Sequence, residues 1–185
     1  MIHIDKSDIT RISRELDAFY TSVKCFCYFS GIRQQNTTDG DGAEFRDFIE
    51  FTLLHTLLAN WTEVFGIGEK NNHWKEITLE NPEFIDRLYR AGEFDYKSWT
   101  EYRNYVNDLS HDFILFPDPY HHKDQQYDLK GIEASLEITH QWLNELVSSN
   151  KNLVASEEIK KWPVEEKNHT DTLKLAVQDI FGVSG

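Results

Sequence analysis

The sequence of 185 residues lacks the features that mark several protein classes. It has only two cysteines, Cys25 and Cys27, which point in different directions if they lie on a helix, so we expect no disulfide framework. No apolar run approaches the ~18 residues that a membrane-spanning helix needs. The first twelve residues also lack the basic and then apolar stretches of a secretory signal. We therefore expect a cytoplasmic protein without a membrane segment.

Basic residues are also few. The chain has 19 Lys and Arg against 32 Asp and Glu, which gives a formal net charge of −13. Such a charge repels the phosphates of nucleic acids and anionic membranes at long range. Any action on RNA must therefore be local, or must use positive charge from a partner.

Two common catalytic motifs are absent. The only candidate for a glycine-rich phosphate loop, GIGE at 66–69, lacks the Lys and Ser/Thr of a P-loop. No Gly-x-Ser-x-Gly segment marks a serine hydrolase. We expect no bound cofactor.

What the sequence does contain is helical periodicity. Alternation with period two is scarce, whereas apolar residues recur at spacings of three and four, which predicts an all-α fold. We expect an antiparallel bundle of four main helices that begin near residues 7, 43, 96 and 129, with short accessory helices, one of them at 81–92. The bundle should occupy residues 1–150. Residues 151–185 should form an extension with one short helix, at 169–181, that packs on the bundle or on a neighbour.

The most informative segment is WTEYRNYVNDLSHDF at 99–113. A 3-4-3-4-3 spacing predicts the buried seam of a helix, formed by Trp99, Tyr102, Val106, Leu109, Phe113 and Phe116. Arg103, Asn107 and His111 should then form a slanting polar row that faces away from the core. This row is either a solvated face or a site where arginine binds a phosphate and histidine transfers a proton. The second interpretation needs another surface to complete a pocket, most simply the same face of a second subunit.

These residues resemble a known family. Arg103 and Asn104, followed by His111 near the end of a helix, resemble the signature of HEPN domains, which are small helical bundles common in bacterial toxin and phage-defence systems. The segments LLANWTEVFG (57–66), HWKEI (73–77) and WTEYRN (99–104) are similar to HEPN-like bacterial proteins related to the abortive-infection group. The resemblance covers about residues 45–147.

The resemblance implies a homodimer in which two such motifs face each other and form a metal-independent endoribonuclease. In that mechanism Arg103 stabilises the scissile phosphate, and His111 serves in acid–base transfer for attack by the RNA 2′-hydroxyl. Asn104 would be a polar positioning group. The implied setting is bacterial defence or a toxin–antitoxin pair, with RNA as substrate and an antitoxin as protein partner.

The motif departs from the family pattern in its spacing. Seven residues separate Arg103 from His111, where the family has four to six. In a straight helix this places the two α-carbons about 12 Å apart along the axis. The side chains of Arg103 and His111 can therefore meet at one phosphate only if the helix bends or if the two residues come from different subunits. Asp108 and Asp112 add negative charge where a phosphate should arrive. The alternative hypothesis is a non-catalytic helical module that binds a protein partner.

One loop raises a metal hypothesis. It combines imidazole and carboxylate groups that suit zinc: Asp118, His121, His122 and Asp124. Loops of this composition are usually just solvated, and no helical ligand pair such as HExxH supports a site. We therefore expect no metal.

The remaining histidines and aromatic residues have structural interpretations. His55 and His140 lie within predicted helices, where hydrogen-bonded packing is the usual role of a histidine. Aromatic side chains at a helix end can stack on a base, but core packing is the expected role of the group here: Trp61, Phe65, His73 and Trp74.

Overall fold

The structure is a computed structural model. It describes residues 5–34, 43–67, 73–122 and 125–149. All regular secondary structure in these ranges is helical, which confirms the all-α class. In chain order the helices are α1 (Lys6–Gln34), α2 (Ala43–Phe65), α3 (His73–Thr78), α4 (Pro82–Gly92), α5 (Tyr96–Leu115), α6 (Pro119–His122) and α7 (Lys130–Ser149).

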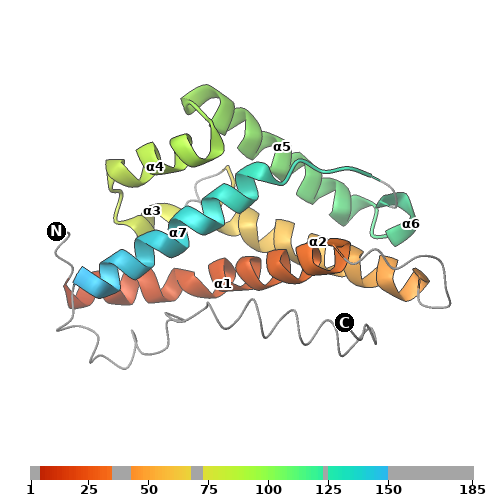
Figure 1. Cartoon of the computed structure of the whole chain (residues 1–185), viewed down its shortest axis with the longest axis horizontal. Coiled ribbons are helices and arrows are strands. Elements are labelled where there is room, and N and C mark those ends of the chain that lie inside the picture. Colours follow the sequence, from red (N-terminus) through yellow and green to blue (C-terminus); the bar gives the residue numbers. More distant parts are fainter. Residues whose placement is uncertain (1–4, 35–42, 68–72, 123–124, 150–185) are drawn as a thin grey trace.

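The main helices begin close to the predicted positions, at Lys6, Ala43, Tyr96 and Lys130. Helices α1 and α2 lie side by side and run in opposite directions (Figure 1). Helix α5 packs on α2, whereas α7 packs on α4, α1 and α3. The short helix α4 therefore contributes more to the packing than its predicted accessory role implies.

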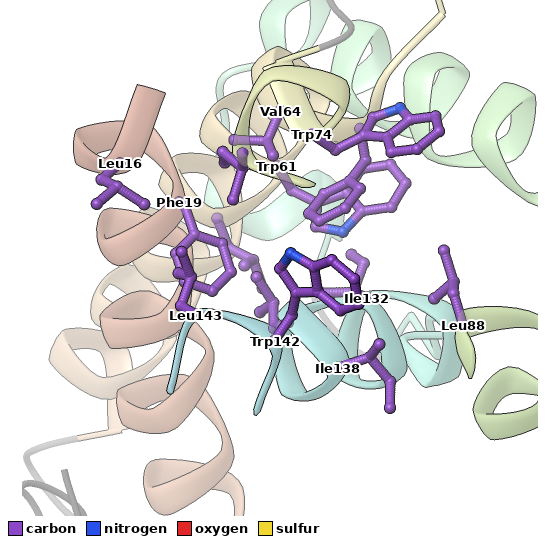
Figure 2. Close-up of a cluster of buried hydrophobic side chains, with 14 of the residues drawn as sticks. Leu16, Phe19, Trp61, Val64, Trp74, Leu88, Ile132, Ile138, Trp142 and Leu143 are labelled. Atoms are coloured by element: carbon purple, nitrogen blue, oxygen red, sulfur yellow. The ribbon is translucent and has the colours of Figure 1, made fainter. Parts of the chain in front are cut away.

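Large aromatic side chains hold these helices together. Trp61 of α2 and Trp142 of α7 are almost completely buried in the cluster that Figure 2 shows. The indole Nε1 of Trp61 donates a hydrogen bond of 2.8 Å to Oγ of Ser135, which joins α2 to α7. The core role predicted for Trp61, Phe65 and Trp74 is confirmed, since all three are buried.

Two sequence signals fix the ends of α5. Asp95 and Ser98 form a reciprocal capping box at its beginning, in which the Asp95 side chain accepts from the Ser98 backbone N–H at 2.7 Å. At the other end α5 continues to Leu115, and Pro117 follows. The chain then turns back toward α2.

Helix α6 lies in a segment predicted as loop. The Asp118 side chain accepts from the Tyr120 backbone N–H at 3.0 Å, and Pro119 occupies the first helical position, so this short turn has the usual signals of a helix start. Helix α6 packs on α2.

Other predictions concern features outside these helices. Both cysteines are free, as expected. Within the described ranges, no helix is long and apolar enough to cross a membrane. The predicted extension at 151–185, with its helix at 169–181, lies outside the described residues.

Candidate functional site

Arg103 does not face away from the protein as predicted. Its guanidinium donates through Nε to the carbonyl oxygen of Phe65 and through Nη2 to that of Gly66. These carbonyls lie at the C-terminal end of α2, where main-chain oxygens lack partners within the helix. Burial lowers the pKa of Arg103 from its ordinary value. A guanidinium nevertheless stays charged in proteins. The prediction that Arg103 lies on an outward row is wrong, because the end of α2 provides acceptors for its guanidinium.

The other predicted residues of the row lie on two different faces of α5. Asn107 is half-buried, and its Oδ1 lies 3.0 Å from the position that a Cβ on Gly66 would take. Asn104 and His111 are exposed, as is Asp108 between them. Their spacing of four and then three residues places them on one solvent-facing stripe, which we call the outer stripe.

The structure does not bring Arg103 and His111 together within one chain. Helix α5 is uninterrupted from Tyr96 to Leu115, so it contains no bend that shortens their separation of about 12 Å along the axis. Asn104 and His111 are available to solvent, whereas Arg103 is held against α2.

The C-terminal end of α5 exposes a group of apolar side chains close to His111. Leu115 is 71% exposed, and Phe116, predicted to belong to the buried seam, is 47% exposed because α5 ends before it. We use the name apolar end patch for four residues of α5, α6 and the turn between them: Ile114, Leu115, Phe116 and Tyr120. Two further exposed aromatic residues, Phe45 and Phe48, lie in the first turns of α2. The start of α2 and helix α6 lie at the same end of the protein (Figure 1). An exposed apolar group of this kind commonly marks an interaction surface.

The same end carries a second cluster, which sequence reasoning found only in part. Asp112 of α5 lies beside His121 and His122 of α6, with Oδ2 3.9 Å from Nε2 of His121 and 4.0 Å from Nδ1 of His122. We call these three residues the Asp–His cluster. Asp118, predicted as a possible fourth member, instead caps α6, and Asp124 lies outside the described residues.

Burial, ring stacking and two hydrogen-bond contacts hold the His122 ring in place. It is buried, and its ring stacks on Phe113 with centroids 3.8 Å apart. Its Nε2 lies 3.0 Å from the carbonyl oxygen of Phe116, and its Nδ1 lies 3.1 Å from the hydroxyl of Tyr127. Burial raises the pKa of Tyr127 to about 12, so this hydroxyl is neutral at physiological pH.

A small pocket of about 150 Å³ lies on the inner side of His122. Its walls come from α1, α2, the end of α5 and α6, and the lining residues are Phe29, Arg33, Asp47, Glu50, Phe51, Leu54, Phe113, Pro119, His122 and Tyr127. Glu50 accepts from Arg46 at 2.9 Å and from Arg33 at 3.4 Å, so ion pairs neutralise much of the charge at this pocket.

Of the remaining histidine candidates, His55 has a packing role. His55 is half-buried and stacks on Phe51 and Phe113 with centroid distances of 6.0 and 6.3 Å. His140 is half-buried on α7. The side chain of His73 is outside what the structure describes.

Comparison of the chain with models of known protein families, with curated protein sequences and with solved structures gives no match. The site must therefore be interpreted from its own chemistry.

Proposed function

We propose that this chain is a HEPN-like helical protein that acts on RNA as a homodimer, in a defence or toxin–antitoxin setting. The observation that carries the proposal is the position of His111, which is exposed on the outer stripe and adjoins the apolar end patch. A second copy that covers this patch would bury Leu115, which is 71% exposed in the single chain. A twofold dimer uses the same surface of both subunits, so it would bring two copies of His111 to one interface.

Two histidines across a twofold axis suit cleavage of RNA without a metal ion. One neutral imidazole accepts the proton of the 2′-hydroxyl as its oxygen attacks the phosphorus. The other, protonated, imidazole donates a proton to the 5′-oxygen as the phosphorus–oxygen bond breaks. The products are a 2′,3′-cyclic phosphate and a free 5′-hydroxyl, so protons and bonds balance.

In this proposal Arg103 is a positioning residue. Its bonds to Phe65 and Gly66 fix α5 on the end of α2 and so orient the stripe that carries His111. Asn104 lies on that stripe two turns from His111 and is available to a longer substrate.

The test is RNA cleavage by the purified full chain in buffer with a metal chelator. We expect His111→Ala to lose at least about 100-fold in rate, as is typical when a general acid or base is removed. His140→Ala, a histidine substitution on α7, should cleave like the wild type. Leu115→Glu should give a monomer in sedimentation and lose cleavage together with the dimer. Equal cleavage by His111→Ala and the wild type would refute the proposal.

The second candidate is a non-catalytic helical module that binds a protein partner through the apolar end patch. The contacts of Arg103 favour it, because a guanidinium held by two carbonyls has fewer donors for a phosphate. Asp108 and Asp112, on either side of His111, also repel phosphate. A wild-type chain that cleaves no RNA but forms a complex lost in Leu115→Glu would support this candidate.

A further inference from the structure

We propose that the Asp–His cluster binds a divalent transition-metal ion of the zinc class, with Asp112, His121 and His122 as its protein ligands. The site is separate from the proposed ribonuclease chemistry, which uses His111 and needs no metal. It also differs from the loop site considered from the sequence, because a carboxylate from α5 takes the place of the loop carboxylates.

The three side chains are close to a ligating geometry. One potential ligand atom from each lies within 4.8 Å of the other two. Tetrahedral zinc with bonds of about 2.0 to 2.1 Å holds its ligand atoms roughly 3.4 Å apart, so the separations between the ligand atoms must shorten by up to about 1.4 Å. The side chains of His121 and Asp112 are 43% and 38% exposed, and rotation of these two can supply the contraction while His122 stays in place.

The surroundings of His122 set the tautomer that a metal needs. The carbonyl oxygen of Phe116 can only accept a hydrogen bond, so the proton lies on Nε2, which is 3.0 Å away. Nδ1 therefore carries the lone pair, and it lies 3.1 Å from the hydroxyl of Tyr127 and 4.0 Å from Oδ2 of Asp112. In metal sites, a histidine ligand usually donates its other ring N–H to a main-chain carbonyl or a carboxylate.

Tyr127 does not prevent a metal ion from binding Nδ1 of His122. Its hydroxyl lies 3.1 Å from Nδ1 of His122 and also 3.1 Å from Oε1 of Gln125. When a metal occupies the lone pair of Nδ1, the hydroxyl can donate to Gln125 instead. Both Nδ1 of His122 and the hydroxyl of Tyr127 then have a partner.

The donor set selects the kind of ion. Two imidazole nitrogens and one carboxylate oxygen suit Zn²⁺, Co²⁺ or Ni²⁺, whereas Ca²⁺ and Mg²⁺ prefer sites built from oxygen alone. Three protein ligands leave at least one coordination position, which water would fill. The ion would join α5 to α6, so its binding should raise the melting temperature.

The experiment is titration of the chelator-treated full chain with Co²⁺, followed by visible absorption, and with Zn²⁺, followed by calorimetry. We expect one ion per chain, cobalt bands of a tetrahedral or five-coordinate site, and displacement of Co²⁺ by Zn²⁺. Asp112→Asn and His121→Ala should each weaken metal binding by at least about 10-fold, since even the loss of a group that only orients a metal ligand costs that much. Both residues are partly exposed, so circular dichroism should show folded variants.

Two variants provide matched controls. Asp108→Asn removes the same charge one turn earlier on α5, and His111→Ala removes the exposed histidine next to Asp112. Both should bind metal like the wild type. The proposal is refuted if millimolar Co²⁺ gives no visible absorption bands and millimolar Zn²⁺ gives no heat of binding. Equal metal affinity of Asp112→Asn and Asp108→Asn would also refute it. Because cleavage is assayed with chelator and metal binding is assayed without RNA, the failure of one proposal leaves the other intact.

Discussion

Arg103→Ala should destabilise the fold. The substitution removes two charge-assisted hydrogen bonds and leaves the carbonyls of Phe65 and Gly66 without these donors at a crowded helix end. Hydrogen bonds to charged groups contribute about 1.5–3 kcal/mol, and carbonyls left unsatisfied on burial cost a similar amount. Because water can reach part of the vacated space, we expect a loss of about 2–3 kcal/mol in the free energy of unfolding.

Urea denaturation and thermal melting of the full chain measure this loss. For a protein of this size each kcal/mol shifts the melting temperature by about 2–4 °C, so Arg103→Ala should melt roughly 4–12 °C below the wild type. Arg103→Lys should recover only part of the loss, since one ammonium cannot reproduce the fork of a guanidinium across two acceptors.

Arg90→Ala is the matched control. Arg90 is exposed, and its Nε donates to the main-chain oxygen of Asp86 within its own helix. Its removal should change stability by less than about 0.5 kcal/mol. The structural role of Arg103 is refuted if Arg103→Ala and Arg90→Ala unfold at the same urea concentration as the wild type.

Three further predictions concern the core and the pH dependence. Gly131→Ala should cost about 1–3 kcal/mol, because a Cβ there would lie 2.3 Å from the ring of Tyr102; an unchanged melting temperature would contradict this packing. Ser135→Ala should cost about 1–3 kcal/mol, because the buried indole of Trp61 loses its acceptor; urea denaturation that matches the wild type would argue against the bond. The folded pKa of Tyr127, about 12, lies above the unfolded value near 10, so its contribution is complete below pH 10 and lost as the pH rises toward 12. The urea midpoint should therefore fall less between pH 9 and pH 11 in Tyr127→Phe than in the wild type.

Helix positions could be predicted from the sequence because their signals are local. Helix α2 begins at Ala43, the predicted position, and Asp95 with Ser98 marks the start of α5 through a capping box. Helix α6 was missed because its four residues are too few to show a periodic pattern.

The candidate site was harder to predict because it depends on which helix ends meet. Periodicity gives the angular position of Arg103 on α5, but it does not indicate that the carbonyl end of α2 lies opposite. Similarly, Asp112 and His121 are nine positions apart, and only the turn after α5 brings them within 3.9 Å. A polar residue at the border of a seam is thus as well placed to cap a neighbouring helix as to bind a substrate.

This geometry determines how a loss of cleavage in Arg103→Ala must be interpreted. A residue that only holds α5 on α2 lowers the rate by unfolding the protein. A residue that touches the phosphate lowers the rate in a fully folded chain. Assays at a temperature where circular dichroism shows Arg103→Ala to be folded separate the two cases. With the contacts that Arg103 makes, the folded variant should keep most of its cleavage, whereas His111→Ala should not.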